Sequence, residues 1–216
     1  MVLKDKIELL DSYSQLDDFT MEQRLVIKKL SYDSNSFVRG LVASLMVNSV
    51  NEFGFEILSR LSKDKNVYVR IEAFDSFSVF ADVRVIELLQ NVINNEKNTL
   101  AKSYAIMSFG DVVSILQLCD KYTHYILNIK NVSKSKECIL SCLYCLSVFG
   151  QNVVDEILFY LDDNNYRIRM SAIAILEEIV NSKNKGVILN KLVELLKYEK
   201  VRAVREKIKS FITKYN

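Results

Sequence analysis

A short motif with an acidic and a basic residue recurs along this chain, and it constrains the fold more than any other feature. The basic residue of the motif stands at six positions: Arg39, Arg70, Lys102, Lys136, Arg169 and Arg205. The successive spacings are 31, 32, 34, 33 and 36 residues. A nearly constant period in this range is typical of stacked structural repeats.

Apolar residues follow each basic residue at two fixed distances, three and seven positions later. Residues this far apart lie on one face of a helix, so each motif predicts a helix with one buried stripe. The column at three positions is Val42, Ala73, Ala105, Ile139, Ala172 and Ile208, and the column at seven positions is Met46, Phe77, Phe109, Leu143, Leu176 and Ile212.

An acidic residue precedes the basic residue by six positions in five of the six copies, and Lys130 stands there in the sixth. An Asn lies between acid and base in four copies, at Asn35, Asn66, Asn98 and Asn165. Asn suits a helix N-cap because its side chain accepts a hydrogen bond from an unpaired backbone N–H group. Each motif therefore predicts a turn between two helices, with the base in the first turn of the second helix.

The motif resembles the HEAT repeat, and most closely the short HEAT-like repeat of the phycobilisome-lyase type. Val38-Arg39, Val69-Arg70, Ile168-Arg169 and Val204-Arg205 match its Val-Arg signature, whereas Ala101-Lys102 and Ser135-Lys136 are degenerate. The resemblance covers roughly residues 20–216 and implies a right-handed α-solenoid of antiparallel helix pairs. It also implies a structural ladder of turn acids and bases, made of Asp33, Arg39, Asp64, Arg70, Glu96, Lys102, Asp163, Arg169, Glu199 and Arg205. A row of Arg could instead bind phosphates, but an acid near each base favours neutralisation within the protein.

The chain has no Pro and only five Gly, which removes the main helix breakers and favours an all-α fold. We expect one domain over residues 1–216, with an N-terminal capping segment over 1–19. The helix pairs are expected at about 20–50, 51–81, 83–114, 117–149, 151–181 and 186–216. Gly150 and Gly186 stand where C-terminal helix caps are expected.

The net charge is +2, far from the strongly basic composition of a dedicated nucleic-acid binder. The first residues are already charged, which argues against a secretory signal, and no apolar run is long enough to cross a membrane. These observations predict a cytoplasmic protein with no membrane association.

Three cysteines, Cys138, Cys142 and Cys145, share one helical stripe, and Cys119 and His124 are the only other soft metal ligands nearby. A structural zinc site requires four ligands in a tetrahedral arrangement, so we favour small apolar core residues here. A metal or redox role stays open. A single His and isolated glycines leave no nucleophile–base pair and no phosphate-binding loop. The sequence therefore predicts no catalytic, cofactor or metal residues, and a protein that is not an enzyme.

Positions two residues after each basic residue vary in chemistry, as expected for the groove of a repeat protein that binds a particular partner. They include Glu72, Tyr104, Ser171 and Lys207, which we take as the possible partner surface. The favoured function is a non-catalytic protein–protein interaction module, such as an adaptor, a scaffold or an immunity-type inhibitor. One alternative is a HEAT-like DNA-binding or DNA-glycosylase-type protein, although that family uses Trp and this chain has none. A phycobilin lyase-like chaperone, suggested by the repeat type, is the other.

Overall fold

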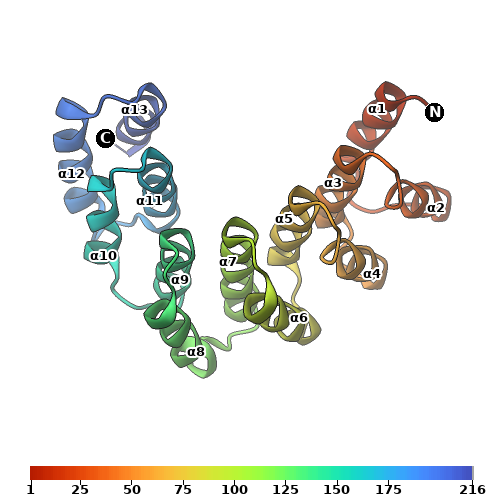
Figure 1. Ribbon diagram of the computed structural model, residues 1–216, viewed down its shortest axis with the longest axis horizontal. Helices are drawn as coiled ribbons and strands as arrows, with labels where there is room; N and C mark the ends of the chain where they lie inside the picture. The colour runs from red at the N-terminus through yellow and green to blue at the C-terminus, as the bar shows by residue number, and fades with distance from the viewer. Residues whose placement is uncertain (216) are drawn as a thin grey trace. The chain divides into compact units, whose positions relative to one another are not determined.

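The computed structural model describes residues 1–215, and these form thirteen α-helices with three short 3-10 helices and no strand (Figure 1). The all-α prediction is confirmed. The α-helices are α1 (Leu3–Tyr13), α2 (Met21–Leu30), α3 (Ser36–Leu45), α4 (Glu52–Leu61), α5 (Val67–Ser76), α6 (Val83–Asn95), α7 (Thr99–Ile115), α8 (Cys119–Val132), α9 (Lys136–Val148), α10 (Val154–Phe159), α11 (Tyr166–Ile179), α12 (Lys185–Tyr198) and α13 (Arg202–Tyr215). The 3-10 helices are Met46–Asn48, Phe77–Val79 and Tyr160–Asp162.

Helix α1 is followed by six consecutive helix pairs, α2/α3 to α12/α13. The chain divides into two compact units, residues 1–118 and 119–216, each of which holds three of these pairs. We describe each unit separately, and the assignment of the whole chain to one domain stays a prediction.

Unit 1 has two layers of helices. Helices α1, α3, α5 and α7 each pack against the next and form what we call the odd layer of unit 1. Helices α4 and α6 pack against their partners α5 and α7, and α2 packs against α3, so these three form the even layer. In unit 2 the corresponding odd layer is α9, α11 and α13, with α8, α10 and α12 packed against them.

Four helices of the odd layers, α3, α5, α7 and α11, begin at the predicted Asn caps, whereas Ser135 caps α9. The Asn35 side-chain oxygen accepts a hydrogen bond from the Phe37 backbone N–H at 2.9 Å, and Asn66 accepts one from Tyr68 at 2.9 Å. Asn98 and Asn165 cap α7 and α11 in the same way. The caps fix where each helix starts, and therefore which side chains turn toward the core.

The two apolar columns form much of the core between the layers. All twelve residues are buried except Ile139 and Ile212, which are half-buried. Three of the largest fully buried side chains, Phe77, Phe109 and Met46, belong to the column seven residues after the base. Burial of such side chains contributes about 1.5–3 kcal/mol each, so the columns hold the helix pairs together.

Gly150 ends α9 as predicted, with φ +84° and the paired hydrogen bonds of a Schellman cap, Gly150 N–H to Ser147 O and Gln151 N–H to Leu146 O. The prediction for Gly186 is wrong, because this residue lies in the first turn of α12. Gln117 takes the cap position after α7 with φ +58°, a conformation that the sequence does not signal for a non-Gly residue.

Among the described residues, no helix combines the length and the apolarity that a membrane-crossing segment needs.

Candidate functional site

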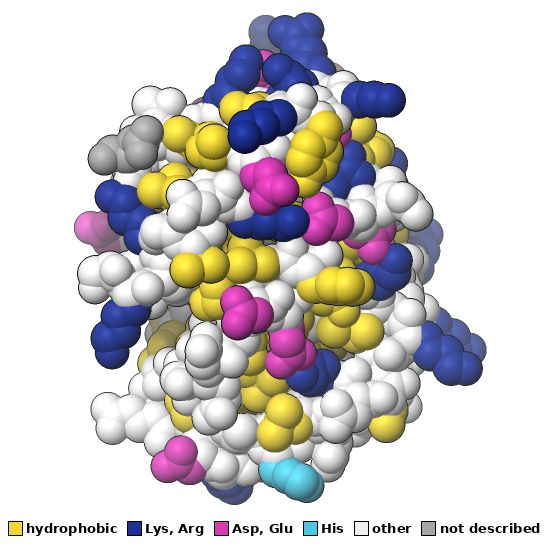
Figure 2. Space-filling view, turned by 90° about the vertical axis from the view of Figure 1, so that its left-hand side faces the viewer, with side chains coloured by type: hydrophobic (Ala, Val, Ile, Leu, Met, Phe, Trp, Pro, Cys, Tyr) yellow, Lys and Arg dark blue, Asp and Glu magenta, His cyan; other side chains and the backbone are white. Residues whose placement is uncertain are grey.

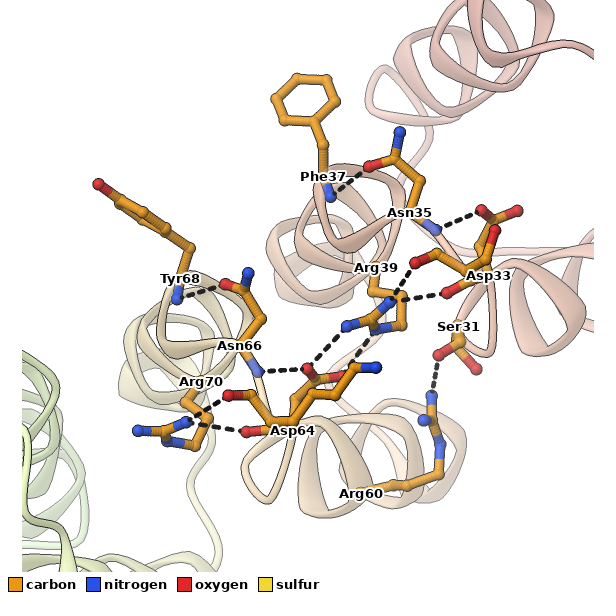
Figure 3. A network of polar contacts seen from close by, with 12 residues as sticks. Ser31, Asp33, Asn35, Phe37, Arg39, Arg60, Asp64, Asn66, Tyr68 and Arg70 are labelled. Atoms are coloured by element: carbon orange, nitrogen blue, oxygen red, sulfur yellow. Dashed lines mark hydrogen bonds and ion pairs between the residues drawn. The ribbon is translucent and has the colours of Figure 1, made fainter.

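The turns of unit 1 are joined by buried ion pairs between successive repeats (Figure 3). The Arg39 guanidinium donates through Nε to Asp64 Oδ2 at 2.7 Å and through Nη2 to Asp64 Oδ1 at 2.8 Å. Its third nitrogen, Nη1, donates to the backbone carbonyls of Asp33 and Ser34. Only 8% of the Arg39 side chain and 9% of the Asp64 side chain are exposed. One guanidinium therefore connects the turn of its own repeat to the turn of the next.

The same arrangement recurs in both units. Arg70 donates to Glu96 in unit 1, and Arg169 donates to Glu199 in unit 2, each through Nε at 2.7 Å. Lysines provide the base at two further steps, where Lys6 of α1 pairs with Asp33, and Lys136 pairs with Asp163.

The ion-pair partner is thus the acid of the following repeat, whereas the six-residue offset in the sequence points to the acid of the same repeat. The same-repeat acid contributes its backbone carbonyl instead: Arg70 Nη1 donates to Asp64 O at 2.9 Å, and Arg169 Nη1 donates to Asp163 O at 2.6 Å. The side chain of that acid is already held by the preceding base, so its carbonyl is the group within reach.

Each ladder acid also orders its own turn. Asp64 Oδ1 accepts a hydrogen bond from the Asn66 backbone N–H at 2.8 Å, and Asp33, Glu96, Asp163 and Glu199 accept equivalent bonds two residues downstream. Hydrogen bonds from Arg39, followed by the turn N–H, hold the pKa of Asp64 below its ordinary value despite burial. These carboxylates are ionised structural groups.

Two predicted ladder bases have no carboxylate partner in the part of the chain that the structure describes. Arg205 donates to the backbone carbonyls of Leu196 and Glu199, and no ion pair involves Lys102. Lys130, at the position of the missing acid, pairs with Glu156 at 2.7 Å. Because Arg39, Arg70 and Arg169 are engaged within the protein, the ladder does not present a free row of guanidinium groups to phosphates.

A groove of about 460 Å³ lies between α3 and α5 on the odd layer of unit 1. The side chains of Phe37 and Tyr68, 57% and 71% exposed, stand at its rim. Figure 3 shows both rings pointing away from the ladder. The groove is lined by Ser36, Phe37, Gly40, Leu41, Ser44, Tyr68 and Glu72.

An acidic cluster adjoins this groove. Glu72 is half-buried and Asp75 is exposed. Partial loss of water contact raises the pKa of Glu72, with a further contribution from Asp75, and it also raises the pKa of Asp75. Burial, then Asp75 and Glu72, raise the pKa of Tyr104 on α7. Among the described residues, neither Glu72 nor Asp75 makes a hydrogen bond or an ion pair with a base.

The structure brings together two of the four residues predicted as a partner surface, Glu72 and Tyr104. Ser171 is half-buried on α11 in unit 2, and Lys207 is paired with Glu177 of α11. Phe37, Tyr68 and Asp75 were missed. The only sequence signal for the two rings is their shared position two residues before a ladder base, and that position does not by itself distinguish an exposed side chain from a core side chain.

Cys138, Cys142 and Cys145 are buried in α9, while Cys119 is half-buried and His124 is exposed. No group of three or more potential metal ligands occurs within residues 1–215. Burial raises the pKa of the Cys142 thiol to about 12, so this sulfur is not a nucleophile at neutral pH.

Thiol labelling of the native protein is expected to modify Cys119 at least tenfold faster than the three cysteines of α9, because reaction requires an accessible thiolate. Mass spectrometry after timed treatment with N-ethylmaleimide measures this difference. Denaturation should make all four cysteines react at similar rates. Rapid native modification of Cys142 would contradict the packing role.

Charges of both signs are mixed with hydrophobic side chains on the face shown in Figure 2, while Lys and Arg gather near the top of that view. In the last helix, Lys207 and Lys214 both pair with Glu177. Part of the basic C-terminal end is therefore neutralised within unit 2.

Neither family models nor curated proteins match this chain in sequence. Among solved structures, the fold is similar to a chain in the complex of CpcE and CpcF of phycocyanin lyase from Nostoc sp. PCC7120. The TM-score is 0.55 with 12% sequence identity, over 99% of this chain and 85% of that chain.

This likeness corrects the prediction that the protein is not an enzyme. That prediction rested on the missing catalytic constellation, yet a similar fold occurs in a chain of a lyase complex. Absence of a recognisable nucleophile or metal site is therefore no ground for excluding an enzymatic role in this fold. The all-helical structure and this likeness show that the chain has a HEAT-like helical fold, similar to that of the matched lyase chain.

Proposed function

We propose that this chain is a lyase-like HEAT module that binds a second protein through the odd layer of unit 1. The observation that carries the proposal is the groove between α3 and α5, with two largely exposed aromatic rings at its rim. Aromatic side chains are enriched at the energetic centres of protein interfaces, because they bury a large area at a small entropic cost.

The ladder supports the proposal because it fixes the groove in advance. Arg39 holds the turn before α3 against the turn before α5 through four hydrogen bonds. Phe37 and Tyr68 stand two residues before the ladder bases Arg39 and Arg70, so their spacing follows from the same contacts. A preformed surface binds with a smaller ordering cost than a flexible one.

The matched solved structure is itself a complex of two proteins, which supports an assembly of this kind. Affinity purification of the full chain from its native host, followed by reconstitution from the two purified proteins, tests the proposal. We expect one partner at a stoichiometric ratio by light scattering. Substitution of Phe37 and Tyr68 by Ala should weaken that complex at least tenfold.

The matched control replaces Met21 and Leu25, which are 74% and 63% exposed on α2, by Ala. This variant should bind the partner as wild type does. A chain that yields no reconstituted complex, or a complex weakened equally by both double variants, would refute the proposed binding surface.

A second candidate is a phycobilin lyase-like activity, in which the chain handles a tetrapyrrole. It is favoured by the likeness to a phycocyanin lyase chain over nearly all of this chain. Titration with a bilin, followed by visible absorbance, should then give a saturable spectral shift. An unchanged spectrum at concentrations well above the protein concentration would exclude this candidate.

A further inference from the structure

Glu72 lines the groove between α3 and α5, and Asp75, which is not a lining residue, follows it on α5. Glu72 and Asp75 lie three residues apart on α5, which places them on neighbouring parts of one helix face. Neither carboxylate makes an ion pair or a hydrogen bond within residues 1–215. Most other carboxylates near the helix turns of unit 1, such as Asp33, Asp64, Asp82 and Glu96, are paired with a base.

The aromatic rings at the rim of the groove are also largely exposed. On the even layer of unit 1, the chain covers its aromatic rings with its own guanidinium groups: Arg60 lies 3.9 Å from the Tyr32 ring centroid, and Arg84 lies 4.2 Å from that of Phe55. Phe37 and Tyr68 have no cation or ring against them in the described part of the chain. A cation over an aromatic face is attracted by the ring quadrupole, so these two faces suit an incoming positive charge.

We propose that this groove binds a basic, amphipathic segment of the partner protein. The inference rests on the proposed function and adds the chemistry of the partner. The Lys or Arg side chains of the segment meet Glu72 and Asp75, and its apolar side chains lie over Gly40 and Leu41 between the two rings.

The lining of the groove fits such a segment in two ways. Gly40 has no side chain, and the nearest atom to an added Cβ would be Glu72 Cγ at 3.7 Å, so a ligand can approach α3 closely there. The volume of about 460 Å³ is within the usual range for a binding pocket. An anionic ligand, such as nucleic acid or the propionates of a tetrapyrrole, would bring like charges next to two unneutralised carboxylates.

Panning a random peptide display library against the full-length chain tests the inference. Recovered peptides, synthesised with a fluorescent label and measured by anisotropy, should combine Lys or Arg with aromatic or aliphatic residues. Replacing Glu72 and Asp75 by Gln should weaken their binding at least tenfold. Added salt should weaken binding to wild type more than to this variant.

Two matched controls accompany these variants. Glu56→Gln with Glu87→Gln removes two exposed carboxylates from α4 and α6 and should leave peptide affinity unchanged. Gly40→Leu should fill the groove and abolish binding, whereas Gly40→Ala, whose methyl group fits without contact closer than 3.7 Å, should retain it.

Recovery of acidic or uncharged peptides, recovery of no peptide above background, or equal binding by the Glu72/Asp75 variant would overturn the inference. The outcomes also separate it from the proposed function. If the native partner binds but the Gln variant leaves its affinity unchanged, the inference fails and the protein-binding function stands. If basic peptides bind the groove but no native complex is reconstituted, the chemistry of the groove stands and the proposed function fails.

Discussion

Replacing Arg39 by Met is expected to lower the free energy of unfolding by about 3–5 kcal/mol, because it leaves a buried carboxylate without its partner. Asp64 would lose both charge-assisted hydrogen bonds, and the carbonyls of Asp33 and Ser34 would lose their donor. Met keeps the length and much of the apolar stem of Arg. The lost stability is therefore due to removal of the guanidinium group. Urea denaturation of the full chain, followed by circular dichroism, measures it.

The matched control is Arg84→Met. Arg84 also contacts two carboxylates, Glu52 and Asp82, but its side chain is 48% exposed. Water screens ion pairs that are open to solvent, so this variant should remain close to wild type. If the two substitutions destabilise the protein equally, the buried Arg39–Asp64 pair contributes no more to the free energy of unfolding than an exposed pair does.

The effect of Arg39→Met should depend on pH. The pKa of Asp64 is lowered in the folded protein, so its contribution to stability is present above its ordinary pKa and is lost as pH falls through the lowered value. The stability difference between wild type and Arg39→Met should therefore be full at neutral pH and shrink below about pH 4. A difference that grows on acidification would contradict the assignment of Asp64 as the ionised partner.

Replacing Gly54 by Ala is expected to destabilise the protein by about 3 kcal/mol, the upper part of the range for overpacking. The added Cβ would lie 2.0 Å from the Ser49 carbonyl oxygen and 3.2 Å from Phe80 Cζ. The Ser49 carbonyl is a backbone atom that accepts a hydrogen bond from the N–H of Asn51, the N-cap residue of α4, at 2.8 Å, so moving it away would break that bond. Thermal unfolding of the variant measures the loss.

Gly40→Ala is the matched control, because Gly40 is also a buried helical glycine. Its added Cβ meets nothing closer than 3.7 Å, and Ala is favoured over Gly within a helix by roughly 0.5–1 kcal/mol. The two glycine substitutions should therefore have opposite signs. A stabilising Gly54→Ala would show that the turn before α4 relaxes more readily than its contacts indicate.

Much of this fold could be read from the sequence because the period, the apolar columns and the Asn caps all describe local structure. The side-chain partner of Arg39 could not, because Asp33 stands 6 residues away in the sequence and Asp64 stands 25 residues away. Only the stacking of α3 on α5 brings the more distant acid to the guanidinium. The sequence predicted part of the candidate binding surface, namely Glu72 and Tyr104. Phe37 was missed because an apolar residue near a helix start reads equally as core, and its exposure depends on which neighbouring helix covers it.

Where the ladder forms, as in the repeats around Arg39 and Arg169, a repeat has two different ends: an acid that pairs with the preceding base and a base that pairs with the following acid. Lys6 shows this at the start of the series, since α1 lacks the full motif yet supplies the cation that Asp33 requires. Two repeats joined in reversed order would place carboxylate against carboxylate and guanidinium against guanidinium. The ladder therefore acts as a directional connector, so an inserted or duplicated repeat can join the stack only head to tail.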